Sequence, residues 1–219
     1  MSVLFELPDY LPAKKIYWKD ANYTFIVGPN GSGKTFLLNK MAEWAEEKNY
    51  SYAFYDATTS LSIAPLLMEQ ASDEDIIYVA KMIMDFSMDF RDDVFNWTKA
   101  KNGHTTDQIG PIGKDAKLLR EVFSMCGNGY TRMFVMLYFG IQNMGNDYYF
   151  LDMPETSLHK HLSRQVINIL MKNFPYTKFV ISTRSPDIID IGWTEDTVIE
   201  MTEDYVNKCR DFKYDEIFS

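Results

Sequence analysis

The stretch GPNGSGKT at residues 28–35 constrains this chain more than any other part of its sequence. An apolar β-type run, YTFIVG (23–28), precedes it, and a run with helical periodicity, KTFLLNKMAEWAEEK (34–48), follows it. The pattern G-x-x-x-x-G-K-[ST] between a strand and a helix is typical of a phosphate-binding P-loop, the Walker A motif. The alternative is a glycine-rich turn without a ligand, which does not require the lysine and threonine that end the motif.

Each residue type in this loop has a physical task. Glycines allow successive backbone N–H groups to point at phosphate oxygens, and the start of the helix adds its positive dipole end. Lys34 supplies a charge between the β- and γ-phosphates, and the Thr35 hydroxyl is a ligand for Mg²⁺. The sequence therefore predicts ATP and Mg²⁺ as cofactors. The nucleotide-binding residues of this loop are Gly28, Pro29, Asn30, Gly31, Ser32, Gly33, Lys34 and Thr35.

A second cluster of polar residues follows the apolar run YYFLD (148–152). Asp152 ends this predicted strand, and Glu155 lies three residues further on. We predict that Asp152 binds magnesium and that Glu155 orients or deprotonates the water that attacks the γ-phosphate. The alternative for Glu155 is a favourable charge at the start of the next helix, which is compatible with catalysis.

Strand and helix patterns alternate along the chain, which predicts an α/β fold with a mostly parallel central sheet and flanking helices. Two short β-runs near the N-terminus predict antiparallel strands, and residues of about 60–145 predict a small helical lobe within a single domain, 1–219. The polar segment 101–115 is the most loop-like. The expected strands are 3–7, 14–18, 23–28, 51–56, 148–152, 178–183 and 196–201, and the expected helices lie within 34–48, 60–100, 116–126, 130–143 and 157–173.

Charge and cysteine usage narrow the function classes. With a net charge of −9 and a pI of about 4.8, the chain is a poor general binder of nucleic-acid backbones. No apolar run of membrane length and no signal-peptide pattern is present, so we expect no membrane partner. Cys126 and Cys209 lie in unrelated contexts and are expected to be free thiols in a reducing cytoplasm.

Three segments together resemble one protein family: GPNGSGKT (28–35), FLDMPETSLHKHL (150–162) and VISTRSPDIID (180–190). They are similar in form and order to the motifs of ABC-type ATPases, specifically the soluble RecF/SMC/OLD-like branch. The resemblance implies a dimer in which two ATP molecules lie between the P-loop of one subunit and the signature segment of the other. The spacing between Lys34 and Asp152 leaves room for a helical lobe but excludes a long coiled-coil arm.

The chain departs from the family at the signature segment, which matches CGNGYTRMFVML (126–137). Gly127, Asn128 and Gly129 occupy the matching positions, so the family's serine is absent, although backbone N–H groups at a helix start can still bind a phosphate. Arg132 follows with the family's spacing. A register that uses Ser124 lacks a glycine two residues on, and a simple turn before a helix is the alternative.

The second departure is Arg184, which matches the family's switch histidine. An arginine is always charged and can bridge phosphate oxygens, so we assign Arg184 to the catalytic set together with Glu155 and Lys34. Alternatively, Arg184 stabilises the nucleotide-bound state so strongly that turnover is slow, or it forms an ion pair with one of the many acidic side chains.

Several further family positions stay open. His159 matches a position that approaches the partner subunit, and a surface histidine without a task is the alternative. Gln70 and Gln108 are both candidates for the family's glutamine loop, and Tyr10 or Tyr17 for adenine stacking, for which packing is the alternative.

We expect an ATP-hydrolysing, dimerising switch that works with a protein partner such as a nuclease, in DNA maintenance or phage–host defence. Direct nucleic-acid binding stays open. The alternative is a nucleotide-binding regulator that does not hydrolyse ATP. A small-molecule kinase is disfavoured because it has no use for the segments ETSLH and TRSPDII, and a transporter subunit because the full LSGGQ signature is lacking.

Overall fold

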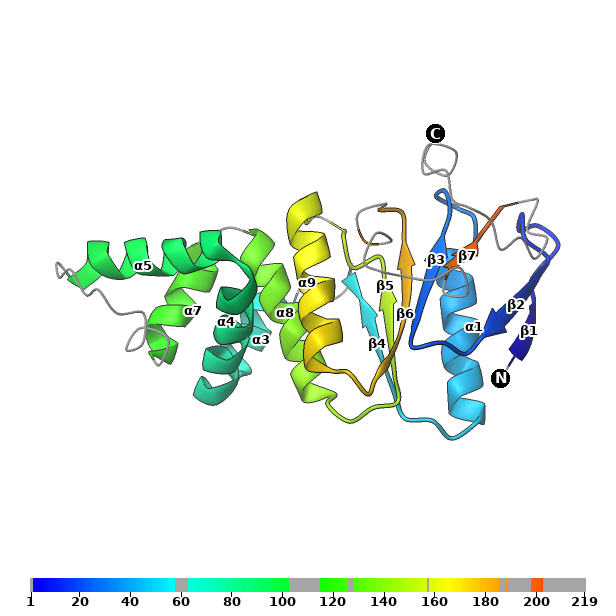
Figure 1. Ribbon diagram of the computed structural model, residues 1–219, viewed down its shortest axis with the longest axis horizontal. Helices are drawn as coiled ribbons and strands as arrows, with labels where there is room; N and C mark the ends of the chain where they lie inside the picture. Colours follow the sequence, from blue (N-terminus) through cyan, green and yellow to red (C-terminus); the bar gives the residue numbers. More distant parts are fainter. Residues whose placement is uncertain are drawn as a thin grey trace. The chain divides into compact units, whose positions relative to one another are not determined.

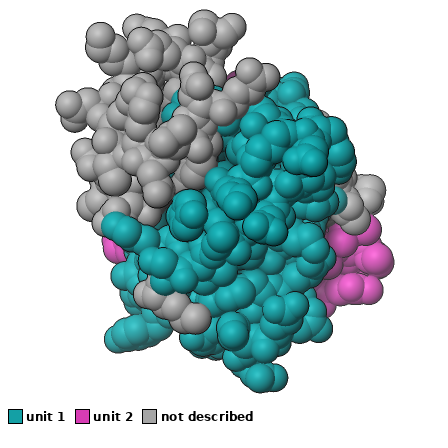
Figure 2. Space-filling model, turned by 90° about the vertical axis from the view of Figure 1, so that its right-hand side faces the viewer, with its two compact units in different colours: residues 1–57, 145–156, 174–219 teal, residues 58–144, 157–173 magenta. Residues whose placement is uncertain are grey.

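The computed structural model describes two compact units of one chain (Figure 2). Unit 1 contains Met1–Ala57, Gly145–Thr156 and Phe174–Ser219, and unit 2 contains Thr58–Met144 and Ser157–Asn173. The residues that the structure describes are 2–57, 63–102, 115–125, 128–156, 158–185, 188 and 198–202.

A five-stranded parallel sheet forms the centre of unit 1 (Figure 1). The strand order is β4-β5-β6-β3-β7, and every neighbouring pair is parallel. The carboxyl ends of all these strands therefore lie along one edge of the sheet, where ligands bind in such folds. The strands are β3 (Tyr23–Val27), β4 (Tyr52–Asp56), β5 (Tyr148–Asp152), β6 (Lys178–Thr183) and β7 (Val198–Glu200).

One face of this sheet packs against α1 (Lys34–Glu47) and against an antiparallel ribbon of β1 (Ser2–Glu6) and β2 (Lys15–Lys19). Trp18 of β2 and Trp44 of α1 meet edge to face at 5.0 Å between ring centroids, both buried. The Trp18 indole N–H donates to the Thr24 hydroxyl at 3.0 Å, which satisfies its polar atom inside the core. This packing holds the start of α1 at the carboxyl edge of the sheet.

Unit 2 consists of helices packed on an aromatic core. Phe90 stacks against Phe123 at 5.3 Å and contacts Tyr130 at 4.7 Å between ring centroids. The Arg120 guanidinium donates to the carbonyls of Met68, in the last turn of the helix Ala64–Gln70, and of Ala71, which follows that helix. The helices are α3 (Ala64–Gln70), α4 (Asp73–Phe86), α5 (Met88–Asn102), α7 (Ala116–Met125), α8 (Asn128–Gln142) and α9 (Lys160–Asn173).

The predicted α/β fold with a parallel central sheet and N-terminal antiparallel strands is confirmed. The helical stretch predicted at 60–100 is divided, because the hydroxyls of Ser72 and Ser87 each accept a backbone N–H and start a new helix. Of the segment expected to be a loop, 101–102 are helical, and 103–114 lie outside the described residues. None of the helices in the described ranges has the length and apolar character needed to span a bilayer.

Candidate functional site

The glycine-rich loop connects β3 to α1 in unit 1. Gly33 is the N-cap of α1 with φ 93°, and it offers no side chain to the free N–H groups of the first turn. No acidic residue lies in that turn either. The start of α1 thus combines unpaired donors with a positive dipole end, which suits an anion.

Two polar side chains of the loop are buried. The Ser32 hydroxyl is buried and has no hydrogen-bond partner. The Lys34 ammonium folds back over the loop and donates to the carbonyls of Gly28 and Pro29, each at 2.8 Å. Burial lowers the pKa of Lys34, Glu155 and Asp152 raise it, and Arg184 lowers it. A phosphate group beside this lysine would oppose the effect of burial, because it adds negative charge.

The two residues predicted to hold magnesium lie side by side. The Thr35 hydroxyl is 2.9 Å from Asp152 Oδ2 and 3.1 Å from Oδ1, although the residues are 117 positions apart in the chain. The reason is topological: Thr35 starts α1 directly after the loop, and Asp152 ends β5 at the same edge of the sheet. The structure therefore brings together a hydroxyl and a carboxylate, both ligands that Mg²⁺ accepts.

Glu155 lies in the turn after β5 and is buried, with an exposed fraction of 9%. The backbone N–H of Arg184 donates to its Oε1 at 2.8 Å, whereas Oε2 is buried without a hydrogen-bond partner. Burial raises the pKa of Glu155. Backbone N–H groups of Arg184 and Glu155, the nearby Thr183 hydroxyl and the Arg184 charge lower this pKa without cancelling the effect.

Arg184 follows β6, and its side chain is exposed. Its charge acts on both Lys34 and Glu155, because it changes the pKa of each. The sequence-predicted catalytic residues Lys34, Glu155 and Arg184 thus belong to one electrostatic cluster around the loop.

These residues fit a magnesium–nucleotide complex. A Cβ at Gly28 would approach Ser32 Oγ to 2.9 Å and Met201 Cβ to 3.0 Å, so any side chain there would crowd the loop. A Cβ at Gly31 would meet nothing within 4 Å, which leaves that part of the backbone open to a ligand. Within the described ranges, no cluster of three His, Cys, Asp or Glu residues could hold a metal alone. Mg²⁺ usually takes one or two protein carboxylates and completes its shell with substrate phosphates and water.

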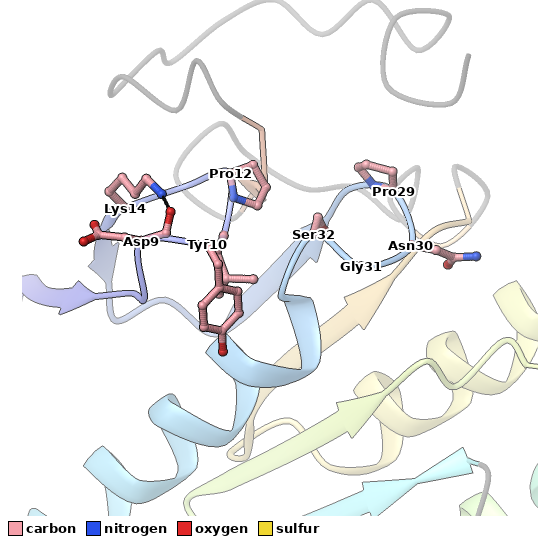
Figure 3. Close-up of a pocket in the computed structure, with 9 residues that line it drawn as sticks. Asp9, Tyr10, Pro12, Lys14, Pro29, Asn30, Gly31 and Ser32 are labelled. Carbon is pink, nitrogen blue, oxygen red and sulfur yellow. Dashed lines mark hydrogen bonds between the residues drawn. The ribbon is translucent and has the colours of Figure 1, made fainter.

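A cavity of about 620 Å³ adjoins the loop (Figure 3). One wall is Pro29–Ser32, and the other is the turn between β1 and β2. Tyr10 lines this cavity with an exposed fraction of 79%, whereas Tyr17 lies on β2 and is not among the lining residues. Lys14 bonds the Asp9 carbonyl across the same turn (Figure 3). The full set of lining residues is Asp9, Tyr10, Leu11, Pro12, Lys14, Pro29, Asn30, Gly31 and Ser32.

The signature-like residues lie in the segment assigned to unit 2. Gly127 lies outside the described residues, Asn128 begins α8, and Gly129 lies in its first turn. A Cβ at Gly129 would meet Leu162 Cδ1 at 2.7 Å, so close packing of α8 on α9 is reason enough for a glycine. The roles assigned to these three residues stay predictions.

The other open positions also stay predictions. His159 is exposed just before α9, and Gln70 is exposed at the end of α3. Gln108, Cys126 and Cys209 lie outside the described part of the chain.

Sequence reasoning missed two residues that border the acidic pair. Asp56 ends β4 and pairs in register with Asp152, so both side chains point to the same face of the sheet. Ser182 pairs in register with Asp152 from the other side, and its hydroxyl donates to Asp152 Oδ1. An acidic residue at the end of a β-type run was a usable signal for Asp56, whereas a serine inside a strand carried none.

Comparisons with known proteins leave the family undetermined. No family model matches the chain. A search of curated proteins finds no match. Among solved structures, the chain is similar to a nucleotide-free ATP-binding cassette from an ABC transporter, at 12% sequence identity and a TM-score of 0.49, over 93% of this chain and 88% of that chain.

Proposed function

We propose that this chain binds and hydrolyses ATP as an ABC-type ATPase of the RecF/SMC/OLD-like branch, with both units forming one ATPase domain. The observation that carries the proposal is the Thr35–Asp152 hydrogen bond at 2.9 Å. It joins the glycine-rich loop to the acidic pair at one edge of the sheet. A turn without a ligand would not require a hydroxyl, a carboxylate and a buried lysine to converge there.

Binding uses the loop backbone and Lys34. Phosphate oxygens would accept from the free N–H groups at the start of α1 and from the Ser32 hydroxyl, which is buried without a partner. Lys34 would exchange its bonds to the carbonyls of Gly28 and Pro29 for phosphate oxygens. The base would lie in the 620 Å³ cavity against Tyr10, the exposed aromatic residue on its wall.

Hydrolysis uses Glu155. Its Oε2 has no protein partner, so it is available to accept a proton from a water molecule. The water oxygen would form a bond to the γ-phosphorus while the bond from that phosphorus to the β–γ bridging oxygen breaks, which yields ADP and phosphate. Thr35 and Asp152 would hold magnesium, which would neutralise charge on the phosphate oxygens. Arg184, whose charge acts on Lys34, would add a further positive charge near the transferred γ-phosphoryl group.

We further propose a cytoplasmic switch that dimerises when ATP is bound, with Gly127, Asn128 and Gly129 of one copy facing the nucleotide of the other. The net charge of −9 favours a protein partner, such as a nuclease, over direct contact with a nucleic-acid backbone. DNA maintenance or phage–host defence is the proposed setting.

A nucleotide-binding regulator without hydrolysis is the second candidate. It is favoured by the altered γ-phosphate contacts, because Gly127 stands where the family has its signature serine and Arg184 where it has the switch histidine. Burial also raises the pKa of Glu155, which lowers the fraction of carboxylate available as a base at a given pH.

Phosphate release distinguishes the two candidates. Wild type should release phosphate from Mg·ATP, and Glu155→Gln should release at least about 100-fold less while it retains ATP binding. Lys34→Ala should lose about 10- to 100-fold in ATP affinity, the range for a charged hydrogen-bond donor. Lys40→Ala is the matched control, since Lys40 lies on the same helix and interacts with Glu43 and Phe36 of that helix. ATP binding without release by wild type would support the regulator, and unchanged affinity of Lys34→Ala would overturn the site.

A further inference from the structure

We propose that Ser182 is a positioning residue that holds both functional carboxylates in their working geometry. The inference rests on the proposed function and assigns a role to a side chain that is not among the proposed nucleotide or metal ligands. Ser182 lies in β6 and is completely buried.

The sheet register places Ser182 beside Asp152. The two residues are paired across β5 and β6, so their side chains point to the same face. The Ser182 hydroxyl donates to Asp152 Oδ1, and the Thr35 hydroxyl lies 2.9 Å from Oδ2. Asp152 is thereby held from both sides, because Ser182 bonds Oδ1 and the Thr35 hydroxyl lies within 3.1 Å of both carboxylate oxygens.

The same serine also fixes the turn that leads to Glu155. Met153, between the two carboxylates, has φ 49°, a left-handed conformation that is unfavourable for a residue with a side chain. Its N–H lies 3.0 Å from Ser182 Oγ and 3.1 Å from the Ser182 carbonyl oxygen. Ser182 therefore accepts a bond from the first residue of the turn while it donates to the residue before it.

The next residues of the chain continue this support. The backbone N–H of Arg184 donates to Glu155 Oε1 at 2.8 Å. Thr183, which is also buried, accepts from the Ser185 N–H at 2.9 Å and lies near Glu155, whose pKa it lowers. The end of β6 supports Asp152 through Ser182, and the residue that follows this strand, Arg184, supports Glu155. Residues that orient metal ligands in this way typically change metal affinity or activity about 10- to 100-fold when they are replaced.

The test compares Ser182→Ala, Ser182→Thr and Ser163→Ala with wild type. Ser163 is the matched control, because it is also buried and its hydroxyl donates only to the backbone carbonyl of His159 at 3.2 Å in unit 2. Mn²⁺ affinity in the presence of a non-hydrolysable ATP analogue is measured by electron paramagnetic resonance. Phosphate release gives kcat and KM, and thermal unfolding verifies that each variant is folded at the assay temperature.

Ser182→Ala should bind Mn²⁺ about 10- to 100-fold more weakly and lower kcat more than it changes KM. Ser182→Thr retains the hydroxyl and should recover most of the Mn²⁺ affinity, and Ser163→Ala should match wild type in both measurements. Equal Mn²⁺ affinity of Ser182→Ala and wild type would overturn the positioning role and leave the proposed function intact. Failure of wild type to bind Mn²⁺ with the analogue would overturn both.

Discussion

Glu155 holds a carboxylate where its surroundings oppose a negative charge. The side chain is 9% exposed, and burial raises its pKa despite the Arg184 N–H bond to Oε1. The raised pKa brings a carboxyl closer to the pH at which a general base is effective. The same burial lowers the stability of the fold whenever Glu155 is ionised. The environment that favours a general base therefore destabilises the folded protein.

This penalty can be measured as a pH-dependent effect of Glu155→Gln. Because the folded-state pKa is raised, the protonated form stabilises the fold at low pH, and this contribution is lost as the pH rises through the raised pKa. Glutamine does not ionise. We therefore expect Glu155→Gln to melt at a higher temperature than wild type at pH 7–8 and to lose that advantage near pH 4. For a chain of this size, each 1 kcal/mol corresponds to about 2–4 °C.

Glu43→Gln is the control for this experiment, because Glu43 is exposed in α1 and pairs only with Lys40. Its free energy of unfolding should differ from that of wild type by no more than about 0–1 kcal/mol at both pH values, which is the usual contribution of an exposed ion pair. If Glu155→Gln is no more stable than wild type at pH 8 in the absence of nucleotide, burial does not penalise the carboxylate.

At the scale of elements, the junction of β3 and α1 depends on backbone conformation and close packing together. Gly33 has φ 93°, and a Cβ there would lie 2.8 Å from Leu11 Cδ1, in the turn between β1 and β2. Leu11 is buried, so it cannot move away without disturbing the core on which α1 packs. A glycine at this position both permits the left-handed cap and lets the ribbon approach the loop.

Gly33→Ala should therefore destabilise the fold through strain and a clash, and Gly145→Ala through strain alone. Gly145 has φ 97°, and a Cβ there would meet nothing within 4 Å. We expect Gly145→Ala to cost about 1–3 kcal/mol and Gly33→Ala about 1–3 kcal/mol more. Urea midpoints at an unchanged m-value provide the comparison. Equal midpoints for the two variants would mean that the Leu11 side chain moves away from the new methyl group without loss of stability.

At the scale of the whole molecule, one copy of the chain places its acidic pair and its glycine loop in unit 1 and its signature-like residues in unit 2. In the proposed dimer, the second copy supplies those residues to the nucleotide. A net charge of −9 on each copy opposes self-association at low ionic strength, so bound nucleotide contacts must outweigh this repulsion.

Glu155→Gln with Mg·ATP should sediment as a dimer, because hydrolysis no longer opens it. Adding Arg184→Ala should weaken the ATP-bound dimer about 10-fold or more and leave the ADP-bound state nearly unchanged, since only ATP has the γ-phosphate that Arg184 is proposed to contact. Adding Lys40→Ala instead should have no effect, because this half-exposed lysine pairs with Glu43 on its own helix. The measurement should be made at about 0.15 M salt, where the repulsion between distant charges is screened. A monomer under these conditions would contradict the homodimer.

The local sequence by itself determined the secondary structure around the glycine-rich loop and the acidic pair. The strand, loop and helix around residues 28–35 and the strand that ends at Asp152 follow from short-range rules: apolar periodicity, glycine at left-handed positions, and polar residues at strand ends. The 60–100 stretch forms separate helices because the hydroxyls of Ser72 and Ser87 accept hydrogen bonds from backbone N–H groups at the helix starts. These hydrogen bonds are visible only in the structure.

Tertiary structure alone decided how the parts of the site meet. The strand order β4-β5-β6-β3-β7 places Asp56 and Ser182 on either side of Asp152 and brings Asp152 to Thr35, residues far apart in the chain. Tyr10 rather than Tyr17 faces the cavity for the same kind of reason, since the turn between β1 and β2 packs beside the loop. Strand order and register arise from long-range packing, and hydrophobic periodicity specifies which face of a strand is buried without specifying its neighbour.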